Sequence, residues 1–249
     1  ANVVVADIAT AEGRETVELI DDAGGEATFV EVDVSDTESV ENMLDVAVEA
    51  YGSLEFAHNN AGILTDFVDV TGVSEERWNR SIDVNVKRVR ACLKTELPVM
   101  KSQGEGGDRQ HRVGGRAGRD ARALRLLGEQ TRRHRLTKSV ALEHAGRGIR
   151  VNAVAPGPTK TNIQSGLLGD GPGGSAPSLR DRLRTAVRLI RTAIRTIRAD
   201  YATAAMRDVP MGRIADPEEI AGAVAFLCSS DASYVTGHTI PVDGGQAAD

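Results

Sequence analysis

The stretch that decides the fold is LEFAHNNAG, Leu54 to Gly62. Its first half, Leu54 to His58, has the length and composition of a short strand. Its second half, Asn59-Asn60-Ala61-Gly62, is a turn whose small residues let the backbone approach a bound molecule and whose amides can tie neighbouring strands together. The stretch therefore predicts a strand that ends at a ligand-binding turn.

Two similar strands are predicted before it. Val3 to Ala6 is apolar and ends at Asp7, and a helical pattern opens at Thr10. Ala27 to Val32 repeats the strand signal and ends at Asp33. Strands that alternate with helices are parallel and are joined by crossover connections. We therefore expect an α/β fold with a Rossmann-like, doubly wound parallel sheet that binds its ligand at the carboxyl ends of the strands.

Later segments continue the alternation. Ser35-Asp36-Thr37-Glu38 is predicted to be a capping box at the start of a helix, and Trp78 to Leu97 is a further helical stretch. Ile149 to Val154 is predicted to be a buried strand. Asp216-Pro217-Glu218-Glu219 supplies an N-cap, a proline in the first turn and an acidic third residue, so we expect a helix that ends near Ser230.

The composition is that of one globular domain spanning residues 1–249, because 41% hydrophobic and 27% charged residues are ordinary values. No apolar run is long enough for a membrane span and no charged-then-apolar leader opens the chain, so we expect a cytoplasmic protein without a membrane partner. Cys92 and Cys228 fall in helical patterns and are expected to be small core residues, not disulfide partners. No cluster has metal-ligand spacing, so no metal is predicted.

Three motifs follow one another along the chain: Asn59-Asn60-Ala61-Gly62, Asn85, and Pro156-Gly157-Pro158-Thr159-Lys160-Thr161. Each motif alone is weak evidence, but in this order and spacing they make the chain resemble the classical short-chain dehydrogenase/reductase family. The resemblance implies a hydride transfer between a nicotinamide cofactor and a secondary alcohol or its ketone, as in 3-oxoacyl reductases and sugar or alcohol dehydrogenases. It also implies a homodimer or a homotetramer.

The resemblance is clearest over Ala1 to Val99, Leu136 to Asn162 and Pro210 to Gly245. It implies that Asn85 is a catalytic residue, because the matching helix asparagine of the family holds, through its backbone, a water for proton relay. The residues that it implies as cofactor contacts are Asp7, Ile8, Asp33, Val34, Asn59, Asn60, Ala61, Gly62, Pro156, Gly157, Thr159 and Thr161.

Asp7 bears on the choice of cofactor. An acidic side chain at the end of this strand can accept hydrogen bonds from both ribose hydroxyls of the adenosine and would repel a 2′-phosphate, which favours NAD over NADP. The alternative is that Asp7 only caps the loop that follows. For Asp33 and Val34, which match positions flanking the adenine, the corresponding alternative is a plain helix-entry aspartate.

Two parts of the family pattern are missing. The resemblance implies that Ala1 opens at the second strand of the family, so the first strand and the glycine-rich turn that receives the pyrophosphate are expected to be absent. The catalytic serine and the Tyr-x-x-x-Lys pair are also absent as written. Their place is taken by Glu105 to Arg135, which holds nine arginines and four acidic residues. The resemblance places the central strand of the family near Asp108 to Val113, where burying the charged side chains would be costly, so a compact fold built on that strand is not expected.

A reading-frame slip explains the missing catalytic groups. Back-translated and read one nucleotide later, Gly107 to Gly114 gives Ala-Ile-Val-Asn-Thr-Ala-Ser, an apolar strand that ends in serine. The same shift over Leu124 to Arg135 gives Ser-Ala-Tyr-Ser-Ala-Ser-Lys-His-Ala-Val-Ile, which contains Tyr-x-x-x-Lys. The serine codon begins within Val113, the tyrosine codon within Leu126 and the lysine codon within Gln130. The hypothesis is therefore that residues 105–135 are frame-shifted by sequencing error or by mutation.

Alternatives remain. Without Ser and Tyr-x-x-x-Lys, the chain can be a non-catalytic remnant or a dinucleotide-sensing protein. An arginine-rich insertion that binds nucleic acid is a further reading, but the block has no Tyr, Phe or Trp for base stacking, so no nucleic-acid partner is predicted. Residues 163–208 contain an amphipathic pattern with an arginine stripe from Arg184 to Arg198, which predicts a lid over the substrate or, equally, a solvated face on a packing helix.

Overall fold

The computed structural model describes residues 1–63, 73–104, 111–116, 124–160 and 209–248. Every strand pair is parallel, and the ladders form a two-stranded sheet, β1-β2, and a four-stranded sheet, β3-β4-β5-β6. The expected α/β fold is confirmed. The strands are β1 (Asn2–Asp7), β2 (Glu26–Glu31), β3 (Phe56–Asn59), β4 (His111–Arg116), β5 (Ile149–Pro156) and β6 (Thr239–Val242).

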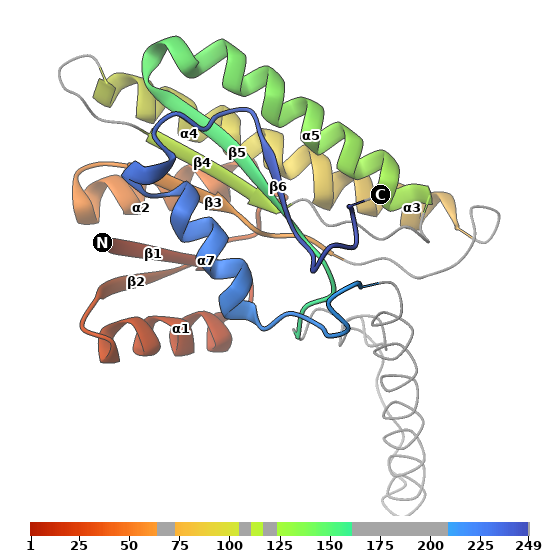
Figure 1. The fold of residues 1–249 in the computed structure, drawn as a ribbon. Helices are drawn as coiled ribbons and strands as arrows, with labels where there is room; N and C mark the ends of the chain where they lie inside the picture. The colour runs from red at the N-terminus through yellow and green to blue at the C-terminus, as the bar shows by residue number, and fades with distance from the viewer. Residues whose placement is uncertain (64–72, 105–110, 117–123, 161–208, 249) are drawn as a thin grey trace, which may run out of the picture.

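Helices cover both faces of the sheets, as parallel strands require (Figure 1). Helices α1 and α7 lie on one face, and α2, α4 and α5 lie on the other. The helices are α1 (Thr10–Asp22), α2 (Thr37–Tyr51), α3 (Glu75–Ile82), the π-helical turn η2 (Asp83–Lys87), α4 (Arg88–Gly104), α5 (Leu124–His144), the short η3 (Ala145–Arg147), α7 (Pro217–Leu227) and the short η5 (Ser230–Ala232).

The main core lies where α4 and α5 pack on the four-stranded sheet. All eight residues of β5 are buried. The buried cluster combines side chains of both helices with β5, and its members are Leu93, Leu97, Met100, Val140, Ala141, Ile149 and Val151. The predicted buried strand Ile149 to Val154 is therefore confirmed and extends two residues further.

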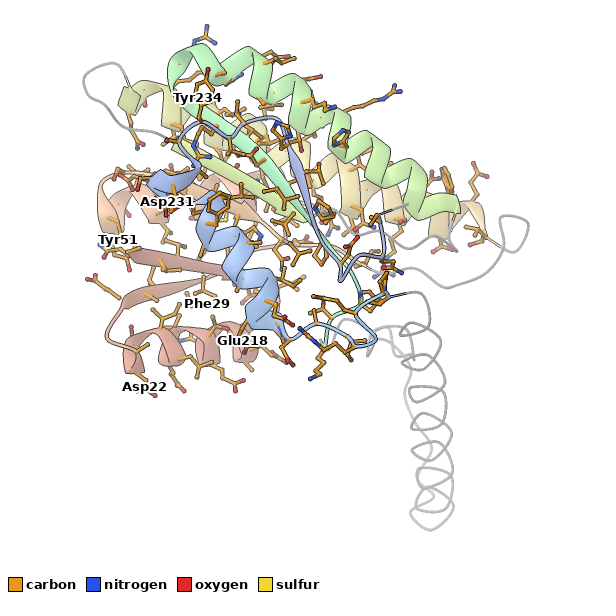
Figure 2. All side chains as sticks on the ribbon, in the orientation of Figure 1. Asp22, Phe29, Tyr51, Glu218, Asp231 and Tyr234 are labelled. Atoms are coloured by element: carbon orange, nitrogen blue, oxygen red, sulfur yellow. The ribbon has the colours of Figure 1, made fainter. Side chains whose placement is uncertain are left out.

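Helix α1 packs on one face of the two-stranded sheet. Phe29 of β2 lies against this helix (Figure 2). A Cβ on Gly13 would come within 2.1 Å of the Phe29 ring, so only glycine admits the ring at this point of the helix. Arg14 of the same helix lies over the Phe29 ring, with its guanidinium carbon 5.6 Å from the ring centroid.

Two predicted helix ends are corrected. Helix α2 is capped by Asp36, whose carboxylate accepts from the Glu38 backbone N–H at 3.2 Å. Ser35 is not the capping residue, because its hydroxyl donates to Asp33 instead. Helix α7 begins as expected, with Asp216 as its N-cap, but it ends at Leu227 and not near Ser230.

The central strand also differs from expectation. The sequence argued against a compact fold with a strand near Asp108 to Val113. In the structure, β4 runs from His111 to Arg116, three residues later, and its backbone pairs in parallel with both β3 and β5. Ladder hydrogen bonds are made by the main chain, which every residue other than proline can supply, so the two flanking strands define this position.

Candidate active site

The predicted cofactor residues lie at the carboxyl ends of strands. Asp7 closes β1, Asn59 closes β3 and Pro156 closes β5, and within each sheet the strands are parallel, so the carboxyl ends of paired strands lie on the same side. Asp7 is exposed, and its carboxylate accepts from the Ala9 backbone N–H at 2.9 Å. Ile8 beside it is 65% exposed. The structure therefore presents an acidic and an apolar side chain at the end of β1.

Asp33 is tied into the entry of α2. Its carboxylate accepts from the Ser35 hydroxyl at 2.6 Å and from the Ser35 backbone N–H at 2.8 Å. These hydrogen bonds hold the pKa of the Asp33 carboxyl below its ordinary value, and the Arg88 guanidinium, 3.9 Å away, acts in the same direction. This geometry fits the alternative of a helix-entry aspartate.

Val34 lines a cavity of about 700 Å³ between the start of α2 and the η2–α4 region. Its charged lining residues are Glu76, Arg80, Asp83, Lys87 and Arg88. The ion pair between Lys87 and Asp83 joins two of these groups across one helical turn. This cavity therefore opens beside the residue predicted to flank the adenine.

Asn85 lies in the π-helical turn η2 and is buried. Its amide makes two hydrogen bonds with the same residue: the Ile63 backbone N–H donates to Oδ1 at 3.0 Å, and Nδ2 donates to the Ile63 carbonyl at 3.0 Å. Nδ2 also lies 3.3 Å from the Ser81 hydroxyl, to which it donates. π-Helical turns often mark functional sites, and this one brings Asn85 to the end of the Asn59–Ile63 turn.

The Asn59–Ile63 turn carries the predicted contacts Asn60, Ala61 and Gly62. At its start, the Asn59 side chain donates from Nδ2 to Glu96 Oε2 of α4 at 3.0 Å. The backbone N–H of Asn60 donates to the His58 carbonyl at 3.0 Å. Since Asn85 holds Ile63, one helical segment binds both ends of the turn.

The loop after β5 is fixed by the neighbouring strand β6. The Gly157 N–H donates to the Val242 carbonyl at 3.0 Å, and a Cβ at Gly157 would come within 2.7 Å of the Asp243 Cα. This close approach requires glycine. The Thr159 hydroxyl donates to the Gly157 carbonyl at 2.9 Å, and Thr159 bridges in parallel to Ala215.

Some predicted features lie outside the described residues. Thr161 and the predicted lid over residues 163–208 are among them. The shifted-frame serine falls at residue 113 of β4, and the tyrosine and lysine fall at residues 126 and 130 of α5, in a part of the chain where the structure describes the backbone but no side chains. Their roles stay predictions.

Sequence reasoning missed Glu96. This carboxyl is 2% exposed, and burial raises its pKa to about 7, against a smaller opposite effect of the Asn59 hydrogen bond. The available signal was its position in α4, since Glu96 stands among Leu93, Leu97 and Met100, which form the apolar side of the helix. A charged residue at such a position needs a polar partner.

Similarity to known proteins identifies the family of this chain. A family model described as Enoyl-(Acyl carrier protein) reductase matches residues 1–177 and 186–247. The chain belongs to the classical short-chain dehydrogenase/reductase family. Membership places it among oxidoreductases that act on CH-OH groups. The predicted resemblance is confirmed.

Individual relatives of this short-chain dehydrogenase/reductase cover nearly its whole length. Cis-4-hydroxycyclohexanecarboxylate dehydrogenase of Sinomonas cyclohexanicum is 35% identical over 250 residues, which is 100% of this chain and 87% of the relative. Cyclohexanol dehydrogenase of an Acinetobacter species is 32% identical over 253 residues, covering 98% and 84%. The crystal structure of 3-ketoacyl-(acyl-carrier-protein) reductase from Brucella melitensis complexed with NADH has a TM-score of 0.78 at 25% identity, covering 98% and 87%.

Family members bind a nicotinamide dinucleotide, and the strand ends of this short-chain dehydrogenase/reductase offer residues that fit one. Asp7 presents an exposed carboxylate at the end of β1, and a cavity opens beside Val34, which follows β2. Over the residues that the structure describes, no group of three or more His, Cys, Asp or Glu side chains could hold a metal ion. In the same residues, no helix combines the length and the apolar character needed to cross a bilayer.

Proposed function

We propose that this chain derives from an NAD-dependent dehydrogenase that interconverts a secondary alcohol and its ketone. The observation that carries the proposal is that Asp7, the Asn59–Ile63 turn and Gly157 lie at the carboxyl ends of β1, β3 and β5. Two relatives named for cyclohexanol-type substrates support a ring-bearing secondary alcohol as the substrate class.

Asp7 supports NAD over NADP. Its carboxylate is exposed at the end of β1, and the Ala9 N–H at 2.9 Å holds it at the start of the loop. In that place a carboxylate accepts hydrogen bonds from the ribose hydroxyls, while a 2′-phosphate would meet a like charge. Ile8 adds an apolar surface for the adenine face, and Val34 lines the cavity on the next strand's end.

The catalytic groups belong, on this proposal, to the shifted reading frame of residues 105–135. Residues 126 and 130 lie in α5, and a separation of four puts two side chains one turn apart on the same helix face. There the tyrosine would exchange a proton with the substrate oxygen, the lysine would lower the tyrosine pKa, and the serine at residue 113 would orient the carbonyl. Asn85 would relay the proton. A bound nicotinamide supplies or accepts the hydride.

The competing function is that of a non-catalytic remnant or dinucleotide sensor. The observation in its favour is that Ser and Tyr-x-x-x-Lys are absent from the chain as written. Such a protein would keep the strand-end residues and bind the dinucleotide without turnover.

The experiment is peptide mass mapping of protein expressed from the native gene, cut at acidic residues and covering Glu96 to Glu143. The dehydrogenase proposal expects Ala-Ile-Val-Asn-Thr-Ala-Ser and Tyr-Ser-Ala-Ser-Lys, together with NADH formation from cyclohexanol and NAD. Recovery of Arg109 to Arg135 as written, with no turnover but measurable NADH binding, would support the sensor. Protein of the written sequence that turns over NADH would eliminate the remnant.

We also propose a homodimer or homotetramer that works in the cytoplasm. Large apolar side chains stand on the surface of α5, α7 and the segment before β6, and they support association. Leu142, Phe226 and Tyr234 are among them, and Figure 2 shows Tyr234 at the periphery of the molecule. Light scattering coupled to size exclusion tests the state, since a monomeric mass at micromolar concentration would contradict the proposal.

A further inference from the structure

Glu96 is a buried ionisable group that the dehydrogenase mechanism does not use. It lies in α4 with 2% of its surface exposed. Its neighbours along the helix, Cys92, Leu93 and Met100, belong to buried apolar clusters. Burying a carboxyl among such side chains is costly, and a methionine or leucine would fill the same volume without that cost. Its presence calls for a role other than packing.

The hydrogen-bond geometry indicates that role. Glu96 Oε2 accepts from Asn59 Nδ2 at 3.0 Å, and Asn59 is the last residue of β3. This bond joins α4 to the first residue of the Asn59–Ile63 turn. At the other end of the turn, Asn85 binds both the N–H and the carbonyl of Ile63 at 3.0 Å. The turn is therefore held at both ends by side chains of the η2–α4 segment.

We propose that Glu96 is a positioning residue for dinucleotide binding: its carboxyl fixes the Asn59 amide and so sets the backbone of the Asn59–Ile63 turn against the cofactor. This inference rests on the proposed function, because the turn is the predicted cofactor contact. The requirement is for a hydrogen-bond acceptor at this position, since Nδ2 of Asn59 can only donate. A negative charge is not required.

Two substitutions separate positioning from packing. Glu96→Gln keeps an acceptor oxygen and the side-chain length, whereas Glu96→Met keeps the length and removes the acceptor. If Glu96 only filled space, Met would be neutral or stabilising, as replacement of buried polar groups by apolar ones often is. Positioning predicts that Met weakens cofactor binding even where it leaves the free energy of unfolding unchanged or raised.

The measurement is the Kd of NADH by fluorescence titration, together with hydrogen–deuterium exchange of the peptide that contains residues 59–63. Glu96→Met should raise the Kd about threefold to tenfold, the loss expected for one hydrogen bond, and should speed exchange in that peptide. Glu96→Gln should stay within about twofold of the unsubstituted protein. Met100→Ala is the control, because Met100 is fully buried one turn further along the same helix, has no side-chain oxygen that could accept the Asn59 hydrogen bond in place of Glu96, and belongs to the apolar cluster.

A double-substitution cycle tests whether the effect passes through Asn59. If it does, Glu96→Met should add little to the Kd of an Asn59→Ala variant, because the contact is already gone. Equal NADH affinity and equal exchange in the unsubstituted and Glu96→Met proteins would overturn the inference while leaving the proposed function intact. Failure of the unsubstituted protein to bind NADH or NADPH would instead overturn the proposed function, and the positioning role with it.

Discussion

Strands β5 and β1 differ in a way that their composition does not predict: the strand with more polar residues is the more buried one. β5 reads IRVNAVAP and carries an arginine and an asparagine, yet all eight of its residues are buried. β1 reads NVVVAD and has a central run of valines, yet none of its residues is fully buried. β5 pairs with β4 on one side and β6 on the other, whereas β1, among the described strands, pairs with β2. Neighbouring elements therefore decide the burial of a strand more than its own apolar content.

The polar residues of β5 are buried because the segment around α7 and β6 supplies their partners. The Arg150 guanidinium donates to the Leu227 carbonyl at 2.6 Å, at the end of α7, and to the Val235 carbonyl at 3.0 Å. The Asn152 amide donates to the same Val235 carbonyl at 2.8 Å and accepts from the His238 N–H at 3.1 Å. These bonds supply donors to main-chain carbonyls at the end of a helix and in a loop.

The largest expected effect comes from breaking this network. Arg150→Ala should lower the free energy of unfolding by about 3 kcal/mol, because it removes the guanidinium donor of the Leu227 carbonyl and one of the two side-chain donors of the Val235 carbonyl, and it leaves a cavity beside them. Urea denaturation measures it. The matched control is Arg14→Ala, which removes an arginine packed over Phe29 in the β1–β2 region. An equal loss in both variants would mean that the two regions do not differ.

The second prediction concerns the buried carboxyl on the β3 side of the sheet. Burial raises the pKa of Glu96 from 4.5 to about 7, so the folded state holds this proton more tightly than the unfolded state. The contribution of this proton to the free energy of unfolding is fully present below pH 4.5. As the pH rises through 7 that contribution, about 3 kcal/mol, is lost.

The measurement is the difference in free energy of unfolding between the unsubstituted protein and Glu96→Gln at pH 5 and pH 8. Glutamine does not titrate, so the unsubstituted protein should lose stability relative to Glu96→Gln when the pH rises from 5 to 8. A difference that is the same at both pH values would show that the carboxyl does not titrate in this range.

A smaller and more direct test compares one valine from each strand. Val151 of β5 is 3% exposed, whereas Val4 of β1 is half-buried. Val151→Ala should cost about 2 kcal/mol and Val4→Ala less than about 1 kcal/mol, because the cost follows the apolar area and the cavity that the substitution leaves. Thermal or urea unfolding of the pair gives the ratio. A greater cost at Val4 would reverse the comparison.

The smallest expected effect lies at the start of α2, beside the two-stranded sheet. Asp36→Ala removes the carboxylate that accepts from the Glu38 N–H and should cost about 1 kcal/mol. Asp36→Asn keeps an acceptor and should recover most of that loss. If Ser35→Ala proved more harmful than Asp36→Ala, the sequence-based capping box would be the better description.

Much of the fold was predictable because it depends on local patterns. The start of the first helix at Thr10, the strand that ends at Asp7 and the buried strand from Ile149 all follow from residues within one element. The capping residue of α2 was missed because Ser35 and Asp36 are both good caps, and the choice depends on the hydrogen bond that Ser35 makes to Asp33.

The candidate site was predictable only as a set of strand ends. The sequence indicated Asn59 and Asn85 separately, but it could not indicate that Glu96 binds the first or that Ile63 binds the second. Those contacts join residues 37 and 22 positions apart. They form only when a helix packs across the end of a strand, and no local pattern encodes that approach.

By itself, the sequence determined that this protein is a parallel α/β member of the short-chain dehydrogenase/reductase family, because strand and helix periodicity and the order of short motifs are written along the chain. Only the tertiary structure decided which polar groups are buried and what satisfies them. Arg150 and Glu96 are ionisable residues that sequence alone would place at the surface. Each is buried because a residue far away in the chain offers a matching acceptor or donor. The burial of a polar group depends on its partners, and partners are set by packing.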